Sequence, residues 1–249
     1  MSFDNAFKPE LRMKITKFRM RFFLLIICRC VFIFAFIVSA TTVNAVENKI
    51  LTKDELILSL EEKFDAIDNY KCIMKIEAYN GKTQYQNQKF IFKKPGMIYC
   101  EQLGPYKEGV VVTVDRDGKI VGCSEGILER VWEWIKGEKW KKSFKKENNE
   151  LKGITGETIF QVDWGYIISE MKRLKEEVDS YSIESQTIDG RDIYVFGLTW
   201  GQKGFLFHID KELMVIVKLE RFFNGKMINS VAWEDMKINI ELEDDFFKV

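Results

Sequence analysis

The sequence predicts an α+β protein in which a curved antiparallel sheet forms an unclosed half β-barrel with covering helices. Three observations predict this fold. About ten segments have apolar residues at every second position, which is typical of strands with one buried face. Short turns rich in glycine, asparagine and aspartate separate these segments and favour antiparallel neighbours. Two other stretches have apolar residues at helical spacing. Because long sheets are twisted, a sheet of this size is expected to curl around the helices.

The first 45 residues have the features of a cleaved signal peptide. Basic residues at positions 14–21 precede an apolar run over 22–38. Val43 and Ala45 are the small residues that signal peptidase needs, so cleavage is predicted after Ala45. Arg29 interrupts the run and leaves apolar stretches too short to span a bilayer comfortably. The sequence therefore predicts a protein secreted to the periplasm or cell envelope, with an uncleaved N-terminal membrane anchor as the alternative.

Charge and cysteine content restrict what the exported part can do. Residues 1–45 carry seven basic and two acidic residues, which leaves 31 basic against 36 acidic residues in 46–249, about −5 net. A mildly acidic domain has no global electrostatic basis for binding nucleic acid. Three cysteines remain, and an odd number excludes a closed disulfide framework. Buried free thiols at Cys72, Cys100 and Cys123 are favoured over one disulfide, whose pair the sequence does not determine.

A helix followed by a meander of strands is predicted for the first half of the domain. Thr52 and Glu55 form a capping box, and apolar residues then recur at helical spacing to about Asn69. From Tyr70 the apolar period changes to two. Strands are predicted over 70–78, 84–93, 96–102, 109–115 and 119–123, with breaks at Asn80-Gly81, Pro95, Gly104-Pro105 and Arg116-Asp117-Gly118.

An insert at about 124–178 precedes a second run of strands. A short helix is predicted around 127–135, an exposed lysine-rich loop over 137–152, and a helix capped by Asp163 thereafter. Strands then resume over 181–188, 192–199, 204–209, 213–222 and 227–242. The sequence has no internal repeat or proline-rich linker, so residues 46–249 are predicted to form a single domain.

Several segments resemble a LolA-like family of exported proteins of unknown function. They are Phe92-Lys93-Lys94-Pro95-Gly96-Met97-Ile98-Tyr99, Leu103-Gly104-Pro105-Tyr106-Lys107-Glu108-Gly109 ahead of a valine strand, and Gly153-Ile154-Thr155. The C-terminal segments are similar to the closing hairpins of LolA and LolB, and comprise Ile209-Asp210, Leu219-Glu220-Arg221, Asn224-Gly225-Lys226 and Trp233-Glu234-Asp235. The resemblance spans about residues 52–247 and is most specific at 92–109.

This resemblance implies an unclosed antiparallel barrel with helices as a lid. In LolA and LolB such a barrel holds the acyl chains of lipoproteins in transit, and a related module in anti-sigma-factor regulators senses mislocalised lipoproteins. The sequence departs from the carriers in two ways. Their functional arginine has no assignable counterpart, and the lysine-rich 137–152 insert has none either. The resemblance therefore implies a lipid-sized cavity more strongly than lipoprotein carriage.

The sequence lacks the motifs of common enzyme classes. Its one histidine, His208, lies on a predicted strand, whereas a Ser-His-Asp or Cys-His site would need it beside a nucleophile. There is no Gly-x-Ser-x-Gly elbow, phosphate-binding glycine loop or histidine-rich metal motif. Carboxylates such as Asp115 and Asp117 fit turn chemistry, which makes a carboxylate hydrolase the weakest alternative. We expect no enzyme, and therefore no catalytic residue, metal or cofactor.

Aromatic residues and methionines predict a site for an apolar ligand. Acyl chains have no polar groups, so their binding needs a contiguous apolar wall, where each buried methylene contributes about 0.8 kcal/mol. Methionine and aromatic side chains suit such walls because they repack. The predicted wall consists of Met74, Ile76, Phe90, Phe92, Met97 and Tyr99, and the predicted lid of Trp132, Trp134 and Ile135. In the alternative, these side chains simply fill the core.

The predicted function is thus binding of lipid or lipoprotein acyl chains by an exported, non-enzymatic protein. The alternative is a protein-interaction or sensor module of the cell envelope with a filled core. Lysines at 136, 139, 141, 142, 145 and 146 are expected either to contact anionic headgroups or a membrane surface, or to form an ordinary solvated face. Contact with an envelope protein is a further expected interaction.

Overall fold

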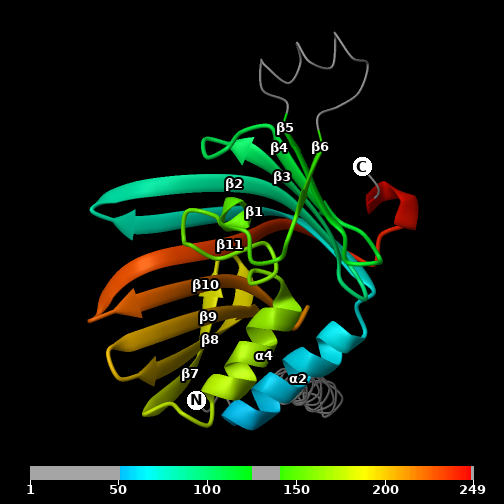
Figure 1. Cartoon of the computed structure of the whole chain (residues 1–249). Coiled ribbons are helices and arrows are strands. Elements are labelled where there is room, and N and C mark those ends of the chain that lie inside the picture. Colours follow the sequence, from blue (N-terminus) through cyan, green and yellow to red (C-terminus); the bar gives the residue numbers. More distant parts are fainter. Residues whose placement is uncertain (1–50, 125–140, 248–249) are drawn as a thin grey trace, which may run out of the picture. The chain divides into compact units, whose positions relative to one another are not determined.

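The computed structural model describes residues 51–124 and 141–247 (Figure 1). These residues belong to one compact unit, Leu51–Val249. The predicted signal peptide, its cleavage after Ala45 and the predicted helix around 127–135 lie outside the described residues.

Eleven antiparallel strands form one curved sheet, and the order across it is β6-β5-β4-β3-β2-β1-β11-β10-β9-β8-β7 (Figure 1). The first strand pairs with the last at the centre of the sheet, where Ile76 lies opposite Val231. The end strands β6 and β7 do not pair with each other, so the barrel is unclosed. The predicted fold class is confirmed. The strands are β1 (Asn69–Asn80), β2 (Lys82–Lys93), β3 (Met97–Gly104), β4 (Val110–Val114), β5 (Ile120–Ser124), β6 (Lys141–Phe144), β7 (Ser180–Ile188), β8 (Arg191–Trp200), β9 (Lys203–Asp210), β10 (Val215–Phe223) and β11 (Lys226–Ile238).

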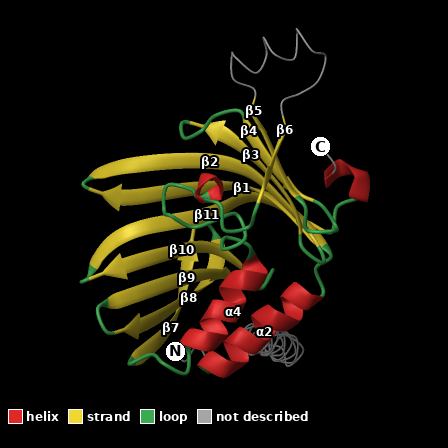
Figure 2. Ribbon diagram, viewed as in Figure 1, coloured by secondary structure: helices red, strands yellow, loops and turns green. Residues whose placement is uncertain are grey.

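Two helices cover the concave side of the sheet, which we call the inner face (Figure 2). Helix α2 (Lys53–Asp65) begins at the predicted capping box, in which the Thr52 hydroxyl accepts a hydrogen bond from the Glu55 amide. Helix α4 (Trp164–Leu174) begins after Asp163, whose carboxylate accepts a hydrogen bond from the Tyr166 amide. Among the described residues, no helix has the length and apolar content needed to cross a membrane.

The alternation of side chains along the strands separates the inner face from the outer face. Along β1, residues at every second position are buried with the two helices in the main hydrophobic core. Parts of the outer face are also covered. Ile193 and Val195 of β8 are 3% and 8% exposed, and the short helix η2 (Asp244–Phe247) lies over β2 and β3. There Phe247 packs against Ile91 and Met97 in a second, smaller cluster.

The structure corrects the predicted loop over 137–152. Lys141–Phe144 forms strand β6 and pairs with β5, and a short helix η1 follows (Asn149–Leu151). The sequence signal for β6 is weak because the strand has only four residues and two of them are lysines. Its pairing depends on Gly122 of β5, where a Cβ atom would lie only 2.5 Å from Cε2 of Phe144.

Candidate functional site

The inner face carries a continuous apolar wall beneath α4. Tyr70 on β1 stands next to Phe90 and Phe92 on β2, with ring centroids 6.1 and 5.4 Å away. On the other half of the sheet, Phe196 of β8 and Phe207 of β9 meet at 6.1 Å. Helix α4 lies over this wall with its own apolar stripe, of which Trp164, Ile167, Ile168, Met171 and Leu174 are buried.

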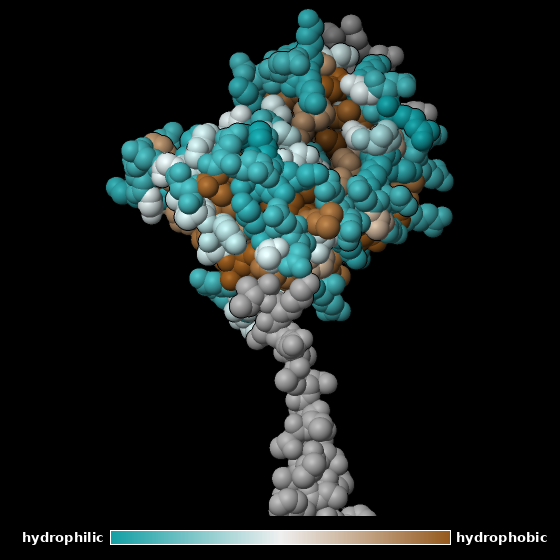
Figure 3. Space-filling model, turned by 90° about the horizontal axis from the view of Figure 1, so that it is seen from below, coloured by the Kyte–Doolittle hydropathy of each residue, from teal (hydrophilic) through white to brown (hydrophobic). Residues whose placement is uncertain are grey.

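A cavity of about 220 Å³ lies between α4 and strands β8 to β10. Its walls are mostly apolar and aromatic: Tyr166, Ile167, Leu174, Trp200, Phe205, Phe207 and Leu219. Charged side chains also line it: Glu157, Glu170, Arg173, Lys203 and Arg221. An apolar cavity with a few charged groups suits an amphipathic molecule. Seen from below, hydrophobic residues show in separate patches between hydrophilic ones (Figure 3).

A half-buried ion pair fixes one side of this cavity. The guanidinium of Arg221 on β10 makes two parallel contacts with the Glu157 carboxylate, at 2.7 and 3.0 Å. The same guanidinium donates a hydrogen bond to Asn229 Oδ1 at 3.0 Å. The two side chains are only 15% and 22% exposed. Bidentate pairs of this kind are strong and directional, so Arg221 holds the segment around Glu157 against the sheet.

A glutamine cluster fixes the same segment further along the inner face. The amide of Ile154 donates a hydrogen bond to Gln86 Oε1 at 3.0 Å. Gln86 Nε2 in turn donates to Gln88 and Gln102, at 3.0 Å each. All three glutamines are buried, and hydrogen bonds among them offset the cost of that burial. Residues 153–162 are therefore an integral part of the inner layer.

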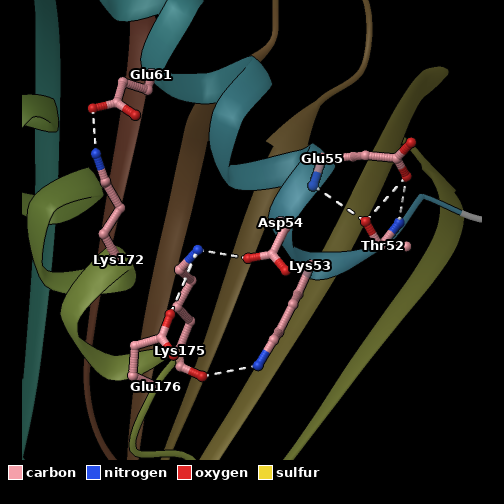
Figure 4. Close-up of polar contacts among 8 residues, drawn as sticks. All are labelled: Thr52, Lys53, Asp54, Glu55, Glu61, Lys172, Lys175 and Glu176. Atoms are coloured by element: carbon pink, nitrogen blue, oxygen red, sulfur yellow. Dashed lines mark hydrogen bonds and ion pairs between the residues drawn. The ribbon is translucent and has the colours of Figure 1, made fainter.

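Exposed polar contacts join α4 to α2 (Figure 4). Lys172 pairs with Glu61 at 2.5 Å, and Lys175 pairs with Asp54 at 2.5 Å. Lys53 Nζ donates a hydrogen bond to the carbonyl oxygen of Lys175 at 2.9 Å. Exposed ion pairs contribute little to stability, but together these contacts link the two helices.

Four of the six predicted wall residues lie together on the inner face. Met74, Ile76, Phe90 and Phe92 belong to the main core, with exposures of 0, 4, 0 and 6%. Ile76 also borders a small cavity of about 30 Å³ beside the glutamine cluster. None of the four lines the larger cavity beneath α4. In this structure they are covered by other side chains.

The other two predicted wall residues, Met97 and Tyr99, lie on the outer face, so placing them on the same wall was wrong. In the β2–β3 pairing, Lys93 faces Met97 and Ile91 faces Tyr99, whereas inward-facing Phe92 faces Ile98. Met97 packs in the second cluster, and the Tyr99 ring lies 5.1 Å from the Phe246 ring at a tilt of 48°. The reason is the register across the Lys94–Gly96 turn, which side-chain character alone does not fix.

The predicted lid residues Trp132, Trp134 and Ile135 lie outside the described residues, and their role stays a prediction. Two of the neighbouring lysines already have local contacts. Lys142 pairs with Glu150 at 2.5 Å, and Lys146 lies 4.9 Å from the centroid of the Phe160 ring. The first contact offsets the charge of one lysine, and the second places the charge of another over an aromatic ring.

His208 and the three cysteines are side chains of the types used in catalysis, and the structure shows the surroundings of each. His208 Nε2 lies 3.2 Å from Glu220 Oε2, so this histidine has a carboxylate neighbour and not a nucleophile. No disulfide joins Cys72, Cys100 and Cys123. Burial raises the pKa of Cys100 to about 12, which disfavours the reactive thiolate. Within the described ranges, no three His, Cys, Asp or Glu side chains are grouped to hold a metal ion.

Sequence reasoning missed the cavity beneath α4 and its Arg221–Glu157 pair. Phe205, Phe207 and Leu219 alternate along β9 and β10 in the manner of inward-facing residues, and this signal was available. The partner of Arg221 was not predictable, because Glu157 lies 64 residues away on an irregular segment.

Neither the protein-family models nor the curated proteins that were compared match this chain. Among solved structures, a LolA superfamily protein from Nitrosomonas europaea is similar at 12% identity, with 80% of this chain and 98% of that chain covered and a TM-score of 0.37. The Mycobacterium tuberculosis lipoprotein LppX is similar at 11% identity, with 78% and 100% covered and a TM-score of 0.44. A chain of a MucA/MucB complex from Pseudomonas aeruginosa is similar at 12% identity, with 79% of this chain and 60% of that chain covered and a TM-score of 0.41. The fold that the LolA-like resemblance implies, an unclosed half-barrel with covering helices, is the fold that the described strands and helices form.

Proposed function

We propose that this chain is an exported, non-enzymatic protein that binds a lipid or lipoprotein acyl chain against the inner face of its half-barrel. The observation that carries the proposal is the cavity beneath α4, about 220 Å³ in volume and walled by Ile167, Phe205, Phe207 and Leu219. An acyl chain needs only such an apolar wall. The charged residues at the same cavity suit the polar end of an amphipathic molecule.

The size of the cavity implies that α4 moves when a whole acyl chain binds. Pockets for small molecules are typically about 300–1,000 Å³, so the present volume holds part of a chain. A shift of α4 would expose the neighbouring wall of Met74, Ile76, Phe90 and Phe92. Because polar contacts join α4 to α2, we propose that the two helices move as a pair.

The energetics allow useful affinity. Ten buried methylenes contribute about 8 kcal/mol, which corresponds to a Kd of about 1 μM before any cost of moving the helices. Losing the contacts of α4 with the sheet would subtract from this value. We therefore expect binding in the micromolar range or weaker for a single chain.

A second candidate function is an envelope protein-interaction or sensor module with a filled core. The observation that favours it is the nearly complete burial of the four inward-facing wall residues. Native mass spectrometry of the protein purified from its own envelope, with organic extraction alongside, separates the two. A co-purifying acylated species supports the carrier. An apo mass with no uptake of fatty acid or lipopeptide favours the interaction module.

Substitutions at Phe205 test the site directly with a fluorescent fatty acid. Phe205 is half-buried at the cavity, so Phe205→Glu places a charge where the chain would lie and should abolish binding. Phe205→Ala enlarges the cavity and should retain binding. The matched control is Phe223→Glu, which charges an exposed phenylalanine outside the cavity and should leave binding unchanged. Equal binding by all three variants, with unchanged circular dichroism, would reject this site.

Export is the remaining part of the proposal and depends on residues 1–45. We expect the mature protein to begin at Val46. Its intact mass after expression with the full leader decides between cleavage and an uncleaved anchor.

A further inference from the structure

Strand β7 lies at one end of the sheet, and its free edge lacks the features that usually protect an edge strand. It pairs with β8 over all nine residues without a bulge, and its other edge pairs with no strand in the described part of the chain. Eight of its nine residues are exposed. Edge strands are usually protected by shortness, lysine, proline or bulges, and β7 contains no lysine, arginine or proline. The opposite edge strand, β6, has only four residues and two lysines.

A groove of about 310 Å³ lies beside this edge. It arises where Ser182 of β7 pairs with Gly197 of β8, because these two residues with little or no side chain lie side by side on the outer face. A Cβ atom on Gly197 would lie 2.6 Å from Ser182 Oγ, so a side chain at this position would displace the serine hydroxyl and occupy part of the groove. Leu206 and Phe222 also line the groove. A strand added to β7 would have space here for one apolar side chain.

We propose that β7 binds an extended peptide segment of another protein by strand addition, with a basic residue opposite Glu184 and an apolar side chain in the adjacent groove. The free edge presents backbone N–H and C=O groups, which a peptide strand satisfies and an acyl chain cannot. Glu184 is the one charged residue of β7 and is exposed, so an opposite charge directly across the strands is favourable.

A second copy of this chain is a poor occupant of the same edge. Antiparallel two-fold pairing over the whole of β7 is centred on Glu184 and would place the two Glu184 carboxylates opposite each other. A basic segment of a different protein avoids this repulsion. The proposal is independent of acyl-chain binding, because it uses the edge of β7 and not the cavity beneath α4.

The probe for the test is a nine-residue peptide, Ser-Thr-Ser-Thr-Lys-Thr-Leu-Thr-Ser. In antiparallel pairing its lysine faces Glu184 and its leucine faces Ser182, on the same side of the sheet. We expect saturable binding to the purified protein, with slower amide hydrogen exchange within β7. Binding without protection of β7, no binding at millimolar peptide, or protection of β7 by self-association alone would each overturn the proposal.

Reversing the charge at position 184 tests the proposed register more directly than binding of a single probe does. Glu184→Lys should weaken binding of the lysine probe by about tenfold and strengthen binding of a probe with glutamate at the same place. Gly204→Ala should weaken binding of the leucine probe, because the alanine Cβ enters the groove that the leucine would occupy, at an ordinary 3.5 Å from Phe222. Binding of a probe with threonine in place of the leucine should not change. Circular dichroism and Tm should be unchanged for Glu184→Lys. Equal affinities of both charged probes for both proteins would contradict the proposed register.

Discussion

The indole ring of Trp164 stacks on the phenol ring of Tyr70, with centroids 4.2 Å apart and ring planes inclined by 19°. The backbone amide of Trp164 also donates a hydrogen bond to the Tyr70 hydroxyl at 3.3 Å. Both residues are almost completely buried. The first residue of α4 is thereby joined to β1 by a ring contact and a polar contact, and this junction sets where the helix begins over the wall.

Separating these two contacts by mutation should give very different costs. Tyr70→Phe keeps the ring and removes the hydroxyl, so we expect a loss of about 1 kcal/mol in the free energy of unfolding. Trp164→Ala removes the ring and leaves a cavity, with an expected loss of about 3–5 kcal/mol. Urea unfolding followed by circular dichroism measures both. Equal losses for the two variants would show that the hydrogen bond, and not the ring, dominates the junction.

The N-cap of α4 should make stability depend on pH. Burial raises the pKa of the Asp163 carboxyl to about 6, against about 3.9 in the unfolded chain. The folded protein therefore holds this proton at a higher pH than the unfolded chain does. The contribution of Asp163 is most favourable below pH 4, is lost as pH rises from 4 to 6, and changes little above that.

Asp163→Asn isolates this effect because asparagine is an equally good N-cap and carries no charge. The variant should have a higher Tm than the wild type at pH 7.5, and the difference should disappear near pH 4. Asp163→Ala, which lacks a capping oxygen, should be less stable than Asp163→Asn at both pH values. A constant difference between wild type and Asp163→Asn across this range would contradict the raised pKa.

The contact of Gly153 with Gln86 should not tolerate a side chain. A Cβ atom on Gly153 would lie 2.7 Å from Gln86 Oε1, and Gln86 is held in place by hydrogen bonds with the other glutamines and Ile154. We expect Gly153→Ala to cost about 1–3 kcal/mol. Gly96→Ala is the control, since a Cβ atom there has no neighbour within 4 Å and should change the stability by less than about 0.5 kcal/mol.

The Arg221–Glu157 pair should behave as a coupled unit. Arg221→Met leaves the Glu157 carboxylate half-buried without its cation, which costs about 3 kcal/mol. Adding Glu157→Leu removes the unpaired charge and should recover part of the loss. A double-mutant cycle measures this coupling, which we expect to exceed about 1 kcal/mol. Simple additivity of the two single losses would mean that solvent already screens the pair.

The fold was predictable because the helix caps, the turn residues and the spacing of apolar residues all indicate the same elements. The capping box at Thr52, the Asp163 cap and the period-two strands all occur near their predicted positions. The exceptions have local causes. Strand β6 depends on the space that Gly122 leaves for Phe144. Strand β11 ends at Ile238 and not at 242 because Asn239 turns into a left-handed conformation, with its side chain accepting a hydrogen bond from the Asp68 amide.

The site was less predictable because it depends on long-range register. Apolar character identified Phe90 and Phe92 correctly as inward-facing but could not place Met97 and Tyr99, whose face is set by the turn between β2 and β3. The cavity beneath α4 needs the helix, three strands and the Arg221–Glu157 pair at once. Such a combination has no local signature in the sequence.

The pairing of β1 with β11 also determines the order in which the molecule can be completed. A ribosome delivers β1 before the other strands and β11 after them, so the centre of the sheet stays open until β11 has been made. Contacts across such a separation are slow to form, and both halves meanwhile present an unpaired edge. A chain truncated before Lys226 would therefore lose the seam between its halves, not a peripheral strand, and should be a poor folder prone to aggregation.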